Sequence, residues 1–314
     1  LPVSGLLIAG LYRLTKMENE NTNAIIDSIH FGDKVPLMLV PAIFISTTIT
    51  HLFGGSAGRE GAALQIGGSL GCYIGRAFRL DDKDMRLATL CGMSAVFAAL
   101  FGTPLTATLF ALEVISVGVI YYSALVPCIV ASLFALEMAN IFGIAPTHFD
   151  VVIEPISELM LLKVSALAIV CSLMSTVFCL SMHKTEHLFA KLIKNPYLRI
   201  AAGGALVVLI TAILGTGDYN GAGMNIIKRA IEEGQAKPDA FFWKLILTAI
   251  TIGCGFKGGE VVPTFFIGAT LGCVLGSLLG IPTGFAAALG LICVFCGAVN
   301  CPVASIVLSI ELFG

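Results

Sequence analysis

The chain has 314 residues, of which 57% are hydrophobic and 12% charged, and its mean hydropathy is +0.95. Soluble domains carry about 25% charged residues, so this composition excludes an ordinary soluble protein and predicts a polytopic integral membrane protein. The formal net charge of -2, without any basic run, argues against a nucleic-acid partner.

Apolar segments long enough to cross much or all of a ~30 Å hydrocarbon core recur along the chain. In chain order they cover residues 36–53, 87–101, 105–119, 123–142, 159–182, 200–214, 241–254, 263–279 and 284–299. Several are too short to span upright or contain Gly and Pro, so we expect some partial helices. Both ends of the chain resemble cuts through a longer protein.

Polar residues between these segments are predicted to be solvated. A mixed-charge loop is expected at 76–86, and a basic loop at 183–199 fits the positive-inside rule. His51 is expected to be packed or interfacial. Most of the ten cysteines lie in apolar runs, and Cys293, Cys296 and Cys301 have no His or Asp beside them. We therefore expect packing roles for them, and no metal or cofactor.

An internal repeat is the clearest structural pattern. "FGTPLTATLFALEV" (101–114) matches "VNCPVASIVLSIEL" (299–312) at a shift of 198 residues, and "GREGAALQIGGSLG" (58–71) resembles "GEVVPTFFIGATLG" (259–272) at a shift of 201. "NTNAIIDSI" (21–29) resembles "GMNIIKRAI" (223–231) at a shift of 202. We predict a single transmembrane transport domain over 1–314, with a first repeat to about residue 150 and a second from about 151. Such repeats are typical of transporters whose site lies between the halves.

Glycine or small polar residues precede an apolar helical run at four places: "GGSAGREG" before Ala62, "GFKGGE" before Val261, "ENTN" before Ala24 and "GAGM" before Asn225. Each is expected to start a helix at membrane depth. A helix N-terminus exposes about four unpaired N–H groups and roughly half a positive charge. Such starts predict an anion site without a fixed cation, and glycine lets an ion approach the backbone.

Glu60 lies at one of these starts, between Arg59 and Gly61. Its carboxylate is itself an anion that could occupy the same amides, and it would leave them once protonated. An ionisable group inside a membrane is a functional hypothesis by default. Glu60 is therefore predicted to gate an anion path and carry a proton; the alternative is a capping acid paired with Arg59.

The chain resembles the CLC family of anion channels and anion/proton exchangers through "GREG" at 58–61, "GGEVVP" at 258–263 and the "P-x8-E" ends of both halves. The resemblance implies an all-α membrane fold, a homodimer with inverted repeats, and discontinuous helices that meet at a central anion site. It implies that Glu60 is the gating glutamate. It also implies an anion path lined by backbone amides around Gly58, Arg59, Glu60, Gly61, Gly259, Glu260 and Val261.

Departures from the chloride-type pattern point to one branch of that family. Chloride-type members usually carry Gly-Ser-Gly-Ile-Pro at the first helix start, a proline after the Gly-Arg-Glu-Gly motif, and an apolar residue at the position of Glu260. Here the first start reads "MENENTNAII" and Ala62 follows the motif. These features look like the fluoride-exporting branch, in which Asn or Met replaces the selectivity serine. The match assigns that role to Asn21, with Asn19 and Asn23 near enough to leave the register open.

The physics of fluoride fits that branch. Fluoride is smaller and more strongly hydrated than chloride, so its site must offer strong, close donors such as the amide of Asn21, which could otherwise be a helix cap. Glu260 would repel a resident anion when ionised, so it should be protonated in part of the cycle or displaced; alternatively it pairs with Lys257. Phe265 and Phe266 could line the path with ring edges or pack in the core.

Glu113 and Glu311 end apolar helices at equivalent positions of the repeats and are expected to anchor the interface between them. The family also usually places a tyrosine on the anion path in its last helices, beyond Gly314.

The sequence thus predicts a fluoride/proton antiporter, not an enzyme, that exports fluoride through the plasma membrane of a microbial cell. Its expected partners are fluoride or chloride, protons, the bilayer and a second copy. Three alternatives stay open: a chloride channel or chloride/proton exchanger, an intramembrane enzyme with Glu60 and Glu260 as paired acid and base, and a purely structural subunit.

Overall fold

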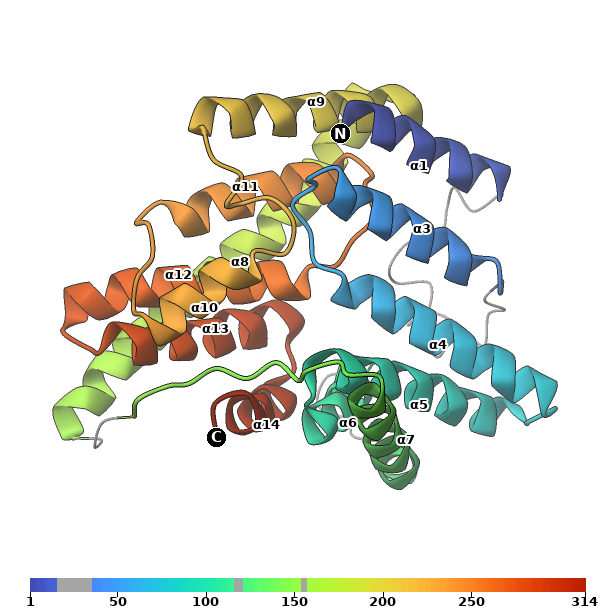
Figure 1. Cartoon of the computed structure of the whole chain (residues 1–314), viewed down its shortest axis with the longest axis horizontal. Coiled ribbons are helices and arrows are strands. Elements are labelled where there is room, and N and C mark those ends of the chain that lie inside the picture. Colours follow the sequence, from blue (N-terminus) through green and yellow to red (C-terminus); the bar gives the residue numbers. More distant parts are fainter. Residues whose placement is uncertain (16–35, 116–120, 154–156) are drawn as a thin grey trace.

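The computed structural model of the protein describes residues 1–15, 36–115, 121–153 and 157–314. These ranges fold almost entirely into helices (Figure 1). In chain order the described helices are α1 (Pro2–Leu14), α3 (Leu39–Leu52), α4 (Glu60–Ala77), α5 (Asp82–Phe101), α6 (Pro104–Glu113), α7 (Tyr122–Ile141), α8 (Glu158–Leu192), α9 (Pro196–Leu214), α10 (Met224–Glu232), α11 (Ala240–Gly253), α12 (Val261–Leu279), α13 (Thr283–Val299) and α14 (Pro302–Phe313).

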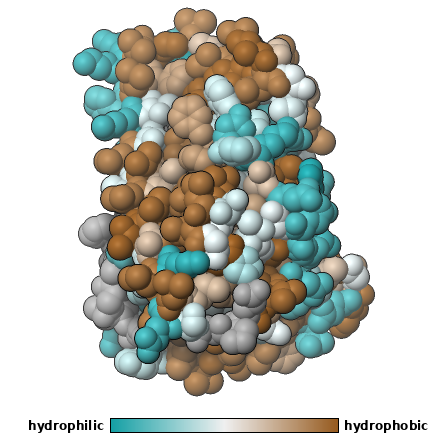
Figure 2. All heavy atoms as spheres, turned by 90° about the vertical axis from the view of Figure 1, so that its left-hand side faces the viewer, coloured by the Kyte–Doolittle hydropathy of each residue, from teal (hydrophilic) through white to brown (hydrophobic). Residues whose placement is uncertain are grey.

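Helix length separates full spans from partial ones. Among the described helices, α5, α7, α8, α9 and α12 are long and apolar enough to cross a membrane, whereas α1, α3, α11, α13 and α14 are shorter apolar helices. The predicted mixture of full and partial helices is therefore confirmed. Apolar side chains cover much of the face presented in Figure 2, as expected for a protein that lies in a bilayer.

The basic segment at 183–199 is not the predicted loop. α8 continues to Leu192, because no Gly or Pro interrupts the chain between its N-cap, Ser157, and Pro196. Lys191 lies in its last turn, where a cation is favoured by the partial negative charge of the helix end.

The predicted loop at 76–86 is also shorter than expected. α4 runs to Ala77, and α5 begins at Asp82. The side chain of Asp81 accepts the backbone N–H of Asp84 at 2.8 Å and so caps α5. The charged residues from Asp82 onward therefore belong to the first turns of α5, which begins earlier than the apolar segment at 87–101 suggests.

The two halves of the chain contain corresponding helices in the same order. α3 pairs with α11, α4 with α12, α5 with α13 and α6 with α14, and α3 and α11 each have 14 residues. In Figure 1, α3, α4 and α5 lie on one side of the molecule, α11, α12 and α13 lie on the other, and α6 and α14 meet between them. This arrangement supports the duplication predicted from the sequence.

Both halves use the same glycine packing. A Cβ on Gly67 of α4 would overlap the carbonyl oxygen of Gly92 on α5, and a Cβ on Gly268 of α12 would overlap that of Gly290 on α13. Each helix pair therefore packs backbone to backbone, as small residues allow in membrane proteins.

Two glutamates link the halves reciprocally. Glu113, at the end of α6, accepts the backbone N–H groups of Val303 and Ala304 at 3.2 and 2.8 Å, in the first turn of α14. Glu311, on α14, accepts those of Leu105 and Thr106 at 3.0 and 2.8 Å, in the first turn of α6. Each carboxylate thus caps the helix of the other half, and these bonds anchor the interface between the halves as predicted.

Five phenylalanines close the core between the halves. Consecutive ring centroids lie 4.6 to 6.1 Å apart around the closed set Phe97, Phe101, Phe265, Phe295 and Phe110. The rings come from α5, α6, α12 and α13. This packing holds the ends of both helix pairs together beside the site described next.

Candidate functional site

The two glycine-rich helix starts meet in the middle of the fold. The N–H of Gly58 donates to the carbonyl of Gly259 at 2.7 Å, and the N–H of Gly259 donates to the carbonyl of Gly58 at 2.5 Å. These bonds form an isolated antiparallel bridge. The loops before α4 and α12, which lie about 200 residues apart in the sequence, are therefore joined directly.

Glycine is needed here so that the two loops can touch. A Cβ on Gly259 would overlap the backbone nitrogen of Gly61, and a Cβ on Gly61 would lie 3.0 Å from the Cα of Gly259. A Cβ on Gly58 would overlap Oε2 of Glu60. Glycine at these positions therefore allows close approach of the two loops, in addition to the predicted access of an ion to the backbone.

Glu60 is buried at the first position of α4, with 4% of its surface exposed. Its carboxylate interacts with the backbone amides of Arg59 and of Glu60 itself. Oε1 lies 3.7 Å from Nε of Arg59, whose side chain is 67% exposed, and Oε2 is buried without a hydrogen-bond partner among the described residues. Buried polar atoms in proteins are nearly always paired, so this oxygen marks Glu60 as unusual among the buried groups and as a candidate for a functional role.

The first N–H groups of α4 and α12 have no acceptor within their own helices. The first backbone hydrogen bonds of α4 and α12 are donated by Ala63 to Arg59 and by Thr264 to Glu260. The N–H groups of Gly61 and Ala62 in α4 and of Val261 and Val262 in α12 therefore lie outside the helical ladder, and Pro263 has no N–H group to place. Val261, the first residue of α12, is buried.

Glu260 precedes α12 and lies in different surroundings. Its side chain is exposed, and its charge interacts with those of His183 and Glu186 on α8. The charged neighbours of Glu60 are instead Arg59 and Lys244. The two carboxylates are thus held in separate electrostatic environments.

The remaining predicted residues have mixed outcomes. Asn21, with Asn19 and Asn23, lies outside the described residues, so its role stays a prediction. Phe265 is 1% exposed, and its ring lies 5.7 Å from Phe101 and 5.1 Å from Phe295 between centroids. These contacts support the packing alternative for Phe265.

Sequence reasoning missed Lys244, a fully buried lysine in α11. Its Nζ donates to the carbonyls of Tyr219 and Gly221 at 3.1 and 2.6 Å. The signal was present, since Lys244 is the one charged residue in the apolar run 241–254.

Such an arrangement can exchange one anion for another. The positive end of a helix can hold the Glu60 carboxylate or a small external anion, and protonation of the carboxylate removes the charge that holds it there. The chemistry required is therefore binding and proton transfer.

Comparison with known proteins identifies the family to which the chain belongs. A sequence model of the voltage gated chloride channel family matches residues 4–314. A chloride/fluoride channel protein of Pseudomonas syringae pv. tomato is 40% identical over 323 residues, which cover 100% of this chain and 71% of that protein. An uncharacterized protein of Methanocaldococcus jannaschii is 25% identical over 99% of this chain and 78% of its own length.

Solved structures agree with this match. The crystal structure of a CLC-type fluoride/proton antiporter has a TM-score of 0.96 and 33% identity, and the match covers 100% of this chain and 80% of that one. A slow cyanobacterial Cl⁻/H⁺ antiporter shares the fold at a TM-score of 0.74 and 21% identity, over 99% of this chain and 78% of that one. The chain is an integral, multi-pass membrane protein that belongs to the voltage-gated chloride channel, or CLC, family.

Proposed function

We propose that this chain exchanges fluoride for protons across the plasma membrane of a microbial cell and so exports fluoride. The observation that carries the proposal is the buried carboxylate of Glu60, which lies against helix-start amides where the two halves meet. The name of the Pseudomonas relative and the similarity to a solved fluoride/proton antiporter support fluoride as the ion.

Glu60 gates the path and carries the proton in this proposal. When ionised, its carboxylate occupies the amides and excludes fluoride. When protonated, it loses its attraction to the helix N-terminus and leaves the amides to the incoming anion. One set of amides cannot hold two anions at once, so fluoride entry and protonation of Glu60 become coupled.

The amides around Arg59, Gly61 and Val261 hold fluoride in this proposal, and Gly58 and Gly259 keep the two helix starts close together. Backbone N–H groups suit fluoride because a small, strongly hydrated anion needs short, strong donors to replace its water. Asn21 is proposed to add a side-chain donor that tunes selectivity.

Glu260 is proposed as a secondary carboxylate that modulates the path from the side of α8. Its exposed side chain and its interaction with His183 and Glu186 support a separate position from Glu60. Phe265 is proposed to form part of the wall of the anion path, where it packs against Phe101 and Phe295.

A second copy of the chain is the proposed protein partner, as the family resemblance implies. Members of this family are channels or transporters, which supports transport over the intramembrane-enzyme and structural-subunit alternatives.

The test uses purified protein in fluoride-loaded liposomes, with external fluoride and internal pH recorded together. Wild type should release fluoride and take up protons with it. Glu60→Gln should lose proton uptake, because glutamine cannot carry the proton. Glu232→Gln, at a partly exposed glutamate on α10 paired with Lys228, is the matched control and should behave as wild type. Proton uptake that survives Glu60→Gln would refute the gating role.

Chloride transport is the second candidate, supported by the name of the same Pseudomonas relative and by the fold shared with a Cl⁻/H⁺ antiporter. The same liposomes loaded with chloride separate the two candidates. Chloride release at a rate comparable to that of fluoride would favour the chloride reading.

A further inference from the structure

Lys244 has no role in the exchange proposed above, yet it is fully buried in an otherwise apolar helix. A buried lysine is costly unless its N–H groups are bonded, and an ionisable group at membrane depth usually serves a function. Besides its two carbonyl acceptors, its Nζ lies 5.2 Å from the ring centroid of Phe266. All three contacts belong to the second half of the chain.

The carbonyls that Lys244 binds belong to the 215–223 segment, which joins α9 to α10. This segment contacts the loop that leads to Glu60: the N–H of Gly221 donates to the carbonyl of Gly55 at 2.9 Å. The hydroxyl of Ser56 donates to the carbonyl of Tyr219 at 2.8 Å, the same carbonyl that Lys244 binds.

Ser56 is also fixed directly to α11, the helix that carries Lys244. Its N–H donates to Oγ1 of Thr251 at 3.2 Å, and its hydroxyl lies 3.1 Å from Oγ1 of Thr248. Ser56 itself is fully buried and lies four residues before Glu60. The backbone that ends in Glu60 is therefore tied to α11 and to the 215–223 segment at one junction.

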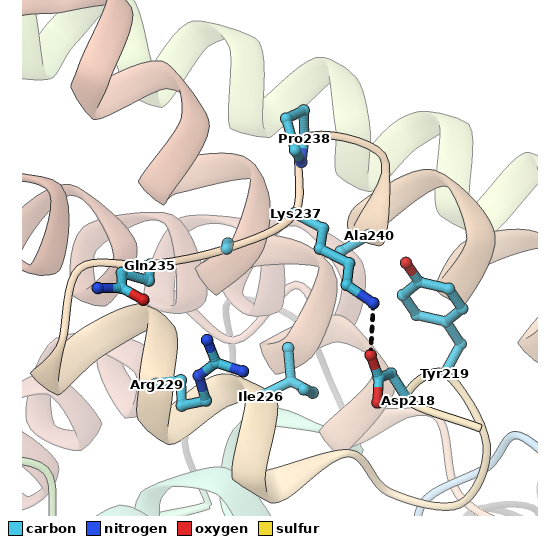
Figure 3. Close-up of a pocket in the computed structure, with 9 residues that line it drawn as sticks. Asp218, Tyr219, Ile226, Arg229, Gln235, Lys237, Pro238 and Ala240 are labelled. Carbon is cyan, nitrogen blue, oxygen red and sulfur yellow. Dashed lines mark hydrogen bonds and ion pairs between the residues drawn. The ribbon is translucent and has the colours of Figure 1, made fainter. Parts of the chain in front are cut away.

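The other side of the 215–223 segment is open. Asp218 and Tyr219 line a cavity of about 320 Å³ together with residues of α10 and of the chain before α11 (Figure 3). On this side the segment is held by the ion pair between Asp218 and Lys237, at 2.7 Å, with both side chains partly exposed. On the buried side, Lys244 supplies two hydrogen bonds.

The charges of Lys244 and Glu60 also interact. Of the charged groups around Glu60, Arg59 has a largely exposed side chain, whereas Lys244 is enclosed by protein. Glu60 is therefore flanked by one cation on its exposed side, Arg59, and by a second inside the protein, Lys244.

We propose that Lys244 is a positioning residue for Glu60. It holds the 215–223 segment against Gly55 and Ser56, and so fixes the loop from which the Glu60 carboxylate reaches the amides. This inference rests on the proposed gating function of Glu60. Without Lys244, the carboxylate no longer returns to a single position on the amides, and fluoride passes without its proton.

The experiment measures fluoride release and proton uptake in liposomes for Lys244→Met, which keeps the length of the side chain and removes its donors. Lys244→Arg is the conservative rescue. Lys163→Met is the matched control, because Lys163 likewise donates to one backbone carbonyl, that of Gly280 at 3.0 Å, at the far end of α12. We expect Lys244→Met to lower the protons taken up per fluoride at least five-fold, with Lys244→Arg and Lys163→Met within two-fold of wild type.

A second comparison separates positioning from general damage to the fold. Glu60→Ala removes the blocking carboxylate and should leak fluoride without protons. In that background, Lys244→Met should change fluoride release by less than two-fold, because there is no carboxylate left to position. An equal slowing of fluoride release with and without Glu60 would overturn the positioning role, as would a wild-type proton-to-fluoride ratio in Lys244→Met.

Should Lys244→Met fail to fold, Ser56→Ala tests the same junction from the other half. It should lower the proton-to-fluoride ratio in the same direction, and an unchanged ratio would overturn the inference. Proton uptake that persists in Glu60→Ala would instead refute the gating function itself, whatever Lys244 does.

Discussion

The reciprocal glutamate caps predict how firmly the two halves are joined. Glu113 is 6% exposed and accepts two backbone N–H groups at the start of α14, so Glu113→Ala leaves both without their acceptor. Glu311 makes the same pair of bonds to α6 in a more exposed position. The two variants remove matched contacts that differ in burial.

The magnitude follows from that burial. Hydrogen bonds to charged groups are worth about 1.5–3 kcal/mol each, whereas hydrogen bonds inside membrane proteins average about 0.6 kcal/mol because the unfolded state finds other partners. Two buried bonds to a carboxylate place the expected loss for Glu113→Ala at about 2–4 kcal/mol of unfolding free energy. For Glu311→Ala, the expected loss of unfolding free energy is about 1–2 kcal/mol, because solvent weakens the bonds of this more exposed carboxylate.

The assay is equilibrium unfolding of the purified protein in detergent, followed by tryptophan fluorescence or by thermal melting. Glu232→Ala removes only a partly exposed i,i+4 pair with Lys228 and should stay within about 0.5 kcal/mol of wild type. Equal stability of Glu113→Ala and Glu232→Ala would refute the capping argument, and a larger loss for Glu311→Ala than for Glu113→Ala would refute the role of burial.

Two further predictions concern the helix pairs and the loop before α10. Gly67→Ala and Gly268→Ala should each cost about 1–3 kcal/mol of unfolding free energy, because the new Cβ meets the crossing helix in both halves. The midpoint temperature of thermal unfolding in detergent should be lower for both variants than for wild type. An unchanged midpoint would contradict the shared packing. The hydrogen bond from Lys237 holds the pKa of Asp218 below its usual value, and the same bond raises the pKa of Lys237. The stabilisation that Asp218 contributes to the folded state is therefore present above the unfolded pKa of its carboxyl, and it is lost as pH falls through the folded pKa. The stabilisation that Lys237 contributes is present below the unfolded pKa of its amine, and it is lost as pH rises through the folded pKa. Asp218→Asn should remove about 0.2–1 kcal/mol at neutral pH and reduce the acid loss of stability, whereas an unchanged profile of unfolding free energy against pH would contradict the pair.

Much of the fold follows from local pattern. The glycine-flanked helix starts locate α4 and α12 to within two residues, and Glu113 and Glu311 are at the interface that their equivalent positions suggested. These features depend on residue type at a fixed spacing, so one sequence is enough to find them.

Other features depend on contacts between distant segments, which residue spacing does not encode. The bridge between Gly58 and Gly259 joins loops whose glycines have an equally good local explanation as helix starts. Lys244 was visible as a lone charge, but its acceptors Tyr219 and Gly221 lie in a loop that carries no comparable signal. The extension of α8 past Met182 was missed because polarity alone does not end a helix.

The central claim is that protonation of Glu60 drives fluoride movement, and an uphill transport measurement tests it most directly. Liposomes with equal fluoride on both sides receive a pH gradient, and the fluoride concentration inside is followed with time. The account predicts that fluoride moves against its own gradient toward the acidic side as protons move the other way, that Glu60→Gln abolishes this movement, and that chloride in place of fluoride is not pumped. Fluoride that stays at equal concentration despite the pH gradient in wild type would contradict it.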